Sequence, residues 1–286
     1  MDNSYVVKIF VESGNPSGVR RVSKSNWSGE CLVFSKNDLS EVLNRLNDQI
    51  GVYVLVGDDL EGNFDQQVYV GQSTQLSNRL KEHAKDESKN FWTQTVVFSS
   101  VSGEMNNGDI KYLESRLICL ARESKRSAIS NANTPVEPAL SAVDKSEAQG
   151  FLKAALDIFS VLGINVFHLA KRLSISTIQY SLSGGVATAM GENQSDGFLV
   201  FKDATARLEE APSIPDRTRN LRSDLVKREI LISAGESYCL MSDYLFDSPS
   251  AASSVLLGRS SNGRTEWKDS DGVTLKTHQE EALEPS

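Results

Sequence analysis

A short run of apolar, mostly β-branched residues over 51–56 predicts a buried strand. After a polar, turn-prone stretch the chain returns through residues 67–71, so the two segments predict a hairpin with a long loop. Residues 72–83 follow with a helical pattern, and Ser73 or Thr74 is placed to cap that helix. The first half of the chain is organised around this segment.

Periodic patterns predict further elements on either side of it. Strands are expected over residues 5–10, 30–34 and 91–99. Helices are expected over residues 35–48, 109–124 and 144–162, where apolar residues recur at helical spacing. We expect Asp109 to cap the second of these helices and residues 14–27 to form a turn-rich crossing between strands.

A second set of patterns follows the transitional residues 166–177. Strands are expected over 185–190 and 197–201, and a basic helix within 216–232. Ser248 or Ser250 is expected to cap a helix with Pro249 near its first turn, and Asn262-Gly263 is a strong turn signal. These elements give an α+β fold class, followed by a polar tail expected to be disordered over 279–286.

Composition is that of a soluble globular protein, with 286 residues of which 39% are hydrophobic and 24% charged. No apolar run approaches bilayer length and no signal pattern opens the chain, so no membrane contact is expected. The three cysteines match no metal spacing and favour a reducing cytoplasm. A net charge of −8 counts against broad nucleic-acid coating, although residues 217–228 hold five Lys or Arg against one Asp or Glu.

Candidate chemistry gathers at the central segment. Its two strands each carry a tyrosine, Tyr53 and Tyr69, and the helix presents Arg79 and His83 four residues apart on one face. An arginine offers a charged fork for phosphate oxygens, so the arrangement suits a scissile phosphate. Walker, dinucleotide-binding and zinc-cluster motifs are absent from the sequence, which leaves other phosphate chemistries without support.

Glu114 lies inside the apolar stripe of the predicted helix 109–124. A carboxylate there is costly unless a cation or a proton accompanies it. Three interpretations remain open on the residues alone. Glu114 binds a metal ion, forms a buried ion pair with a residue such as Arg79, or lies at the stripe edge and reaches outward.

The triplets Gly51-Val52-Tyr53 and Tyr69-Val70-Gly71, followed by Arg79 and His83, resemble the signature of the GIY-YIG nuclease family. Each triplet departs from that signature by Val in place of Ile, and the gap between the triplets is longer than is typical. The resemblance implies a catalytic domain over residues 51–165 with a small mixed or antiparallel three-stranded sheet flanked by helices. Residues 1–50 would then be an N-terminal extension of strands and a helix.

The same resemblance implies roles for the side chains. Tyr53 would take the proton of the attacking water, Tyr69 would hold the phosphate or the water, and Arg79 would bind the non-bridging oxygens. His83 would shuttle a proton or bind a phosphate oxygen. Glu114 would bind one divalent ion, Mg²⁺ or Mn²⁺.

Two further features belong to the implied site. Family members carry an asparagine after the glutamate helix, and the spacing does not choose between Asn131 and Asn133; a turn-forming role is the alternative for either. Gly71 permits close approach of the backbone to the substrate at the strand end.

Beyond a linker at 166–177, residues 178–278 resemble an uncharacterised domain (DUF4357-like) often found C-terminal to GIY-YIG modules. The resemblance rests on Ser-Pro-Ser-Ala-Ala at 248–252 and on Asn262-Gly263 before Trp267-Lys268 and Gly272. Arg219 and Arg222 can share one face of the basic helix, and we expect them to contact nucleic acid; a solvated helix face is the alternative.

The sequence therefore predicts a metal-dependent endonuclease that hydrolyses phosphodiester bonds, with DNA as its expected substrate and partner. The alternative function is a catalytically silent module of the same fold that binds nucleic acid or protein. The acidic net charge and the long loop before Tyr69 favour this alternative.

Overall fold

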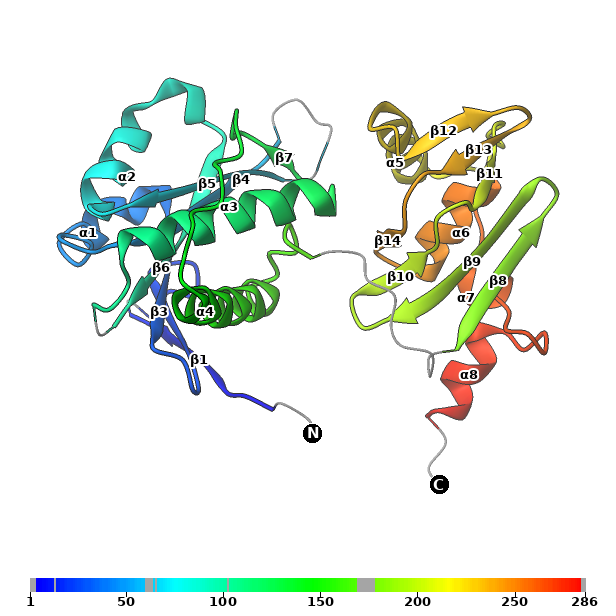
Figure 1. The fold of residues 1–286 in the computed structure, drawn as a ribbon. Coiled ribbons are helices and arrows are strands. Elements are labelled where there is room, and N and C mark those ends of the chain that lie inside the picture. Colours follow the sequence, from blue (N-terminus) through cyan, green and yellow to red (C-terminus); the bar gives the residue numbers. More distant parts are fainter. Residues whose placement is uncertain are drawn as a thin grey trace. The chain divides into compact units, whose positions relative to one another are not determined.

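The computed structural model describes residues 4–12, 14–59, 64, 66–101, 103–168 and 178–283. The chain divides into two compact units, Met1–Leu169 and Ala170–Ser286, called here the N-terminal and C-terminal units (Figure 1). Each unit combines helices with its own sheet or sheets, so the α+β fold class is confirmed. The division falls inside the predicted linker at 166–177, of which residues 169–177 lie outside the described residues.

The N-terminal unit is built on a seven-stranded sheet with the order β1-β2-β3-β6-β4-β5-β7. Its strands are β1 Val7–Val11, β2 Arg20–Lys24, β3 Gly29–Ser35, β4 Gly51–Gly57, β5 Gln67–Ser73, β6 Trp92–Ser100 and β7 Ala128–Ile129. All neighbours pair antiparallel except β5 and β7, which are parallel. The three strands predicted at 51–56, 67–71 and 91–99 are present side by side as β5-β4-β6, and the sheet continues beyond them on both edges.

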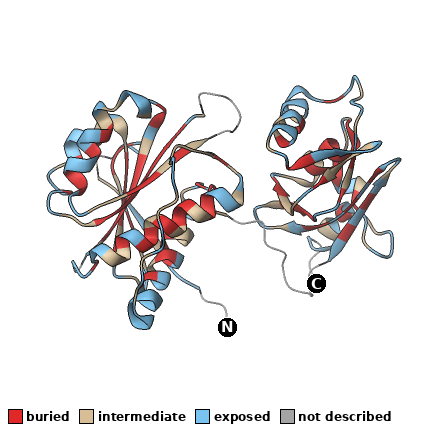
Figure 2. Ribbon diagram, turned by 45° about the horizontal axis from the view of Figure 1, so that its top comes forward, coloured by how far each residue is buried: buried red, intermediate tan, exposed pale blue. Residues whose placement is uncertain are grey.

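Helices cover both faces of this sheet, as Figure 1 shows. They are α1 Leu39–Val42, α2 Leu76–Lys85, α3 Asn107–Ser124 and α4 Ala142–Val161, with short 3₁₀ turns η1 Lys36–Asp38 and η2 Glu87–Lys89. Side chains alternate between the faces of a strand, so β4 contributes to two cores. Val52, Val54 and Val56 pack in the α3/α4 core, whereas Tyr53 and Leu55 pack in the α1/α2 core. This double burial, visible as the red centre of the sheet in Figure 2, explains the unbroken apolar run at 51–56.

Several local predictions for the N-terminal unit were wrong. Residues 14–27 contain strand β2, which pairs with β1 and β3. Its charged sequence, Arg-Arg-Val-Ser-Lys, did not predict a strand. The helix predicted over 35–48 is reduced to η1 and α1 followed by turns. Asn106, rather than Asp109, is the N-cap of α3, and Asp109 completes a capping box from the third helical position.

The C-terminal unit contains two smaller antiparallel sheets and four helices. One sheet has the order β14-β10-β9-β8 and the other β11-β13-β12. The strands are β8 Gln179–Gly184, β9 Ala187–Gln194, β10 Gly197–Val200, β11 Thr205–Arg207, β12 Leu231–Ala234, β13 Ser237–Leu240 and β14 Tyr244–Phe246. The helices are α5 Asp216–Lys227, α6 Pro249–Leu257, α7 Gly263–Glu266 and α8 Leu275–Glu281.

The core of the C-terminal unit surrounds α6. Ser248 caps this helix and Pro249 occupies its first turn, as predicted. The Trp267 ring stacks on Phe198 with 4.4 Å between centroids, and its indole N–H donates to the Pro249 carbonyl at 3.1 Å. Asn262, part of the predicted turn signal, is the N-cap of the short helix α7. The disordered tail was expected from residue 279, which is wrong for residues 279–281 because they belong to α8. Residues 284–286 lie outside the described residues.

Candidate functional site

Tyr53 and Tyr69 lie on the α2 side of the sheet because of the register between β4 and β5. Tyr69 pairs with Leu55, and Tyr53 pairs with Gly71 two positions further along, so the two rings are diagonal neighbours with centroids 6.4 Å apart. Gly71 is required by this packing, since a Cβ there would collide with the Tyr53 hydroxyl. The close approach predicted for Gly71 therefore exists, but its partner in the fold is Tyr53; a nucleic-acid contact at Gly71 is not supported by this packing.

His83 is buried beneath the two tyrosines on helix α2. Its Nε2 atom lies 2.6 Å from the Tyr53 hydroxyl, and its ring centroid lies 5.0 Å from that of Tyr69. Burial, helped by the charges of Lys89 and Arg79, lowers the pKa of His83 to about 4. The imidazole is therefore neutral at pH 7. In the tautomer that carries its proton on Nδ1, Nε2 can accept the Tyr53 proton.

Tyr53 is fully buried, and burial raises the pKa of its hydroxyl above the ordinary value for tyrosine. The neighbouring Tyr69 and Glu114 act in the same direction, whereas the charge and hydrogen bond of Arg79 act against it. The protein by itself thus holds Tyr53 in its protonated form. A proton acceptor such as His83 is needed for Tyr53 to act as a base.

Arg79 reaches the tyrosines from the exposed side of α2. Its guanidinium pairs with the Glu82 carboxylate at 2.7 Å, which raises the pKa of Arg79. The nearby hydroxyls of Tyr53 and Tyr69 raise this pKa further. The Arg79 side chain keeps 44% of its surface exposed, so its cationic head is accessible to an anion that approaches the two tyrosines.

Glu114 joins the same group from helix α3. Burial raises the pKa of Glu114, and against this effect its carboxylate accepts a hydrogen bond from the backbone N–H of Gln72 and feels the charge of Arg79. No salt bridge of Glu114 is found among the described residues. Of the three interpretations left open by the sequence, a closed ion pair with Arg79 is thus wrong. A half-buried carboxylate with spare oxygen lone pairs remains.

These surroundings allow a test of whether a divalent ion fits. Within the described part of the chain, no group of three or more His, Cys, Asp or Glu side chains could enclose a metal. Mg²⁺, however, is commonly held through one or two carboxylates with water and substrate phosphate in its other positions. The single oxygen donor of Glu114 beside two phenols and a guanidinium fits an ion bound in that manner.

Asn131 and Asn133 have different environments. The Asn131 side chain accepts from the Val70 N–H at 3.0 Å and donates to the Val70 carbonyl at 2.8 Å. It thereby continues the pairing of β7 with β5 up to the residue before Gly71. Asn133 is exposed. Asn131 thus lies next to β5, the strand that carries Tyr69, and its side chain binds the backbone. Asn133 is not brought to this strand.

Lys89 is the residue of this group that sequence reasoning missed. Its ammonium lies 3.6 Å from the centroid of the Tyr69 ring, in cation–π geometry. Lys89 ends the 3₁₀ turn η2, where Asp86 accepts hydrogen bonds from the backbone N–H and the hydroxyl of Ser88. The sequence showed only a polar stretch at 85–90. The spacing between Tyr69 and Lys89 in the sequence matches no pattern that would predict their contact.

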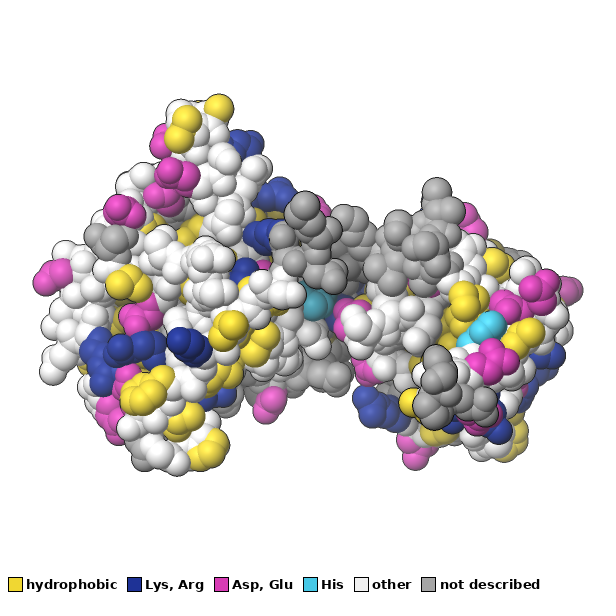
Figure 3. Space-filling model, turned by 90° about the horizontal axis from the view of Figure 1, so that it is seen from below, with side chains coloured by type: hydrophobic (Ala, Val, Ile, Leu, Met, Phe, Trp, Pro, Cys, Tyr) yellow, Lys and Arg dark blue, Asp and Glu magenta, His cyan; other side chains and the backbone are white. Residues whose placement is uncertain are grey.

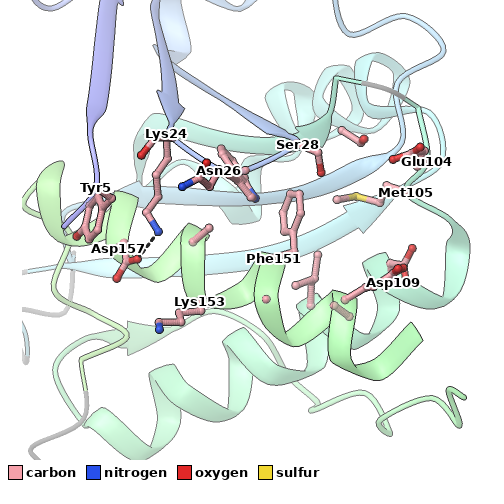
Figure 4. Close-up of a pocket in the computed structure, with 18 of the residues that line it drawn as sticks. Tyr5, Lys24, Asn26, Ser28, Glu104, Met105, Asp109, Phe151, Lys153 and Asp157 are labelled. Atoms are coloured by element: carbon pink, nitrogen blue, oxygen red, sulfur yellow. Dashed lines mark hydrogen bonds and ion pairs between the residues drawn. The ribbon is translucent and has the colours of Figure 1, made fainter. Parts of the chain in front are cut away.

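A cavity of about 600 Å³ lies elsewhere in the N-terminal unit, among β2, the start of α3 and α4 (Figure 4). Trp27, Met105 and Phe151 provide its apolar wall, and the Lys24–Asp157 ion pair of 2.7 Å lies at its edge. None of the tyrosine-site residues lines it, namely Tyr53, Tyr69, Arg79, His83, Lys89 and Glu114. The cavity therefore contributes no group to the site described above.

Arg222 cannot make the predicted nucleic-acid contact, because it is only 2% exposed. Its guanidinium donates to the backbone carbonyls of Arg207, at 2.5 Å, and of Val255, and it pairs with Glu210 at 3.2 Å. Arg219 remains exposed but is paired with Asp216 and with Glu210. The predicted phosphate-binding face of α5 is thus an internal connection between α5, β11 and α6, with neighbouring ion pairs at the surface.

The described surface carries charges of both signs. On the face shown in Figure 3, Lys and Arg side chains are interspersed with Asp and Glu, in keeping with the net charge of −8. None of the helices in the described ranges is long and apolar enough to cross a membrane.

Comparison with known proteins yields one family. The model of a domain of unknown function, DUF4357, matches residues 180–279. The predicted resemblance of residues 178–278 to this uncharacterised domain is confirmed, and it assigns no activity. The chain matches no curated protein and no solved structure. For residues 51–165 the nuclease resemblance stays a prediction.

Proposed function

We propose that the N-terminal unit is a metal-dependent endonuclease that hydrolyses phosphodiester bonds in DNA. The supporting observation is the convergence of five side chains from four elements: Tyr53 on β4, Tyr69 on β5, Arg79 and His83 on α2, and Glu114 on α3. They are the side chains on which the GIY-YIG resemblance rests. A folding core does not require two phenols, a cation and a carboxylate to share one place, whereas phosphoryl chemistry does.

The geometry supports a division of labour among these residues. The accessible guanidinium of Arg79 binds the non-bridging oxygens of the scissile phosphate and stabilises the charge that develops there. Tyr69, close to Arg79, orients the phosphate or the attacking water. Tyr53 takes a proton from that water while its own phenolic proton passes to Nε2 of His83, 2.6 Å away. The neutral state of His83 makes this transfer possible.

Glu114 would hold the divalent ion, as Mg²⁺ or Mn²⁺. When bound, such an ion supplies a positive charge that stabilises the leaving oxygen. Burial raises the pKa of Glu114, and a cation bound to its carboxylate would favour the ionised form.

Cleavage of plasmid DNA in Mg²⁺ or Mn²⁺ tests the proposal. We expect Glu114→Gln and Arg79→Ala each to lower the cleavage rate by about 10²–10³-fold, since each removes a group that stabilises developing charge. Glu123→Gln is the matched control, because it makes the same charge change at an exposed position of the same helix α3. Full-rate cleavage in Glu114→Gln or Arg79→Ala, or an equal loss in Glu123→Gln, would contradict the proposal.

The burial of Tyr53 favours one alternative function. Tyr53 is 0% exposed, which would suit a module that keeps the fold and binds nucleic acid or protein without turnover. That module would bind in a salt-dependent manner and leave the plasmid intact in every metal. Metal-dependent nicking that disappears in Glu114→Gln eliminates it.

A further inference from the structure

Lys89 occupies an unusual position for a lysine. Its ammonium rests on the Tyr69 ring. Burial lowers the pKa of Lys89; the charge of Asp86 acts against this effect and the charge of Arg79 strengthens it. No ion pair of Lys89 is found among the described residues. A cation–π contact contributes only about 0.5–1 kcal/mol at an exposed site, which leaves a partly desolvated ammonium without a full partner in the fold.

Tyr69 connects Lys89 with Arg79. The hydroxyl of Tyr69 lies near enough to the Arg79 guanidinium to raise the pKa of Arg79, and the face of the same ring carries the Lys89 ammonium. The charges of both cations also act on His83, whose ring centroid lies 5.0 Å from that of Tyr69. Two cations therefore lie beside two phenols and a neutral imidazole. Together they form a binding site, called here the anion seat, for an anion that offers more than one oxygen atom.

We propose that Lys89 is a second phosphate-binding residue of this site, so that Arg79 binds phosphate at the hydroxyl of Tyr69 and Lys89 binds it at the ring face. The identification of that phosphate as the DNA backbone rests on the proposed function, whereas the anion seat itself does not. Lys89 would then contribute to substrate affinity in the whole protein. Lys89 itself would neither donate nor accept the proton that passes from Tyr53 to His83.

The first experiment follows the ring protons of His83 by NMR during titration with inorganic phosphate. The chain has three histidines, so the His83 resonance can be assigned with His83→Gln. We expect Lys89→Met, which keeps the apolar stem and removes the charge, to weaken phosphate binding about tenfold. Lys85→Met, an equal charge change at the exposed end of α2, should leave the affinity unchanged, and Lys89→Arg should retain it.

Equal phosphate affinity in the wild type and Lys89→Met overturns the inference, as does a wild type whose His83 resonance does not respond to phosphate. The pKa of His83, measured in the same samples, should rise in Lys89→Met because a neighbouring positive charge is gone. This readout reports the proximity of the two residues without reference to any enzymatic activity.

The second experiment measures DNA binding by fluorescence anisotropy at several salt concentrations, and cleavage kinetics. Lys89→Met should raise KM about tenfold with a smaller change in kcat, and reduce the salt slope of binding by about one. A loss in kcat alone would overturn the phosphate-binding role. If the phosphate titration behaves as expected but wild-type protein neither binds nor cleaves DNA, the anion seat stands and the proposed nuclease function falls.

Discussion

The two units of the chain each contain an arginine that the sequence marks as a phosphate ligand, and the two side chains have opposite surroundings. Arg222 of the C-terminal unit is 2% exposed, and its guanidinium is occupied by two backbone carbonyls and Glu210. Arg79 of the N-terminal unit keeps 44% of its side chain exposed and has an exposed carboxylate as its ion-pair partner. The partners supplied by other elements, not the residue type, decide whether an arginine stabilises the fold or remains accessible to a ligand.

The largest expected effect separates the two arginines by stability. Arg222→Ala should lower the free energy of unfolding of the C-terminal unit by about 3–5 kcal/mol, because it leaves buried carbonyls and Glu210 without their donor. Arg79→Ala should cost less than about 1 kcal/mol, since it removes an exposed ion pair. Chemical denaturation of the full chain measures both. Arg219→Ala, an exposed change on the same helix as Arg222, is the control.

Equal destabilisation by Arg222→Ala and Arg219→Ala would contradict the predicted difference between a buried and an exposed arginine. It would mean that the buried hydrogen bonds of Arg222 contribute no more than an exposed ion pair.

The next effect concerns pH and belongs to the N-terminal unit. The folded-state pKa of His83 is about 4, below the value of about 6.5 expected for the unfolded chain. Between these values the unfolded chain binds a proton that the folded protein does not. The contribution of His83 is therefore fully present above about pH 7 and decreases as pH falls toward 4. Relative to His83→Gln, the wild type should lose about 2 kcal/mol of unfolding free energy between pH 7.5 and pH 5.

Denaturation curves of the wild type and His83→Gln at both pH values measure this difference. A stability difference that does not change with pH would show that His83 is protonated as readily in the folded protein as in the unfolded chain, which would contradict a pKa lowered by burial.

The smallest effect tests whether Arg79 is accessible but partly occupied. Glu82→Gln removes the carboxylate that competes with an incoming phosphate, so DNA affinity should rise by about two- to fivefold, the range of an exposed ion pair. Glu87→Gln makes the same charge change at an exposed position of the η2 turn. Fluorescence anisotropy at constant salt compares the two. An equal gain in both variants would assign the effect to net charge alone.

Local patterns predicted much of the fold. The β5-β4-β6 strands and helices α3 and α4 are present near their predicted ranges, and Ser248 caps α6. The errors have physical causes. Strand β2 is a polar segment that forms a strand because β1 and β3 pair with it. The helix expected over 35–48 ends at Val42, because the same spacing of apolar residues can be satisfied by a helical turn followed by loops.

Most residues of the candidate site could be predicted from the sequence, but the contacts between them could not. Tyr53, Tyr69, Arg79, His83 and Glu114 could be named from the sequence because they lie on elements with clear periodicity. Lys89 could not, since it comes from a short turn and its contact with Tyr69 depends on how that turn folds back. The choice between Asn131 and Asn133 was likewise open until the pairing of β7 with β5 was known.

The sequence by itself determined the strands, the helices and the set of chemical groups, because local periodicity and capping depend on near neighbours along the chain. The tertiary structure alone decided which of those groups are accessible. It paired Tyr53 with buried His83, placed Gly71 where only a hydrogen leaves room for the tyrosine, and enclosed Arg222. Burial and hydrogen-bond partners come from elements distant in sequence, and these two properties set both the pKa of a side chain and its freedom to bind a ligand.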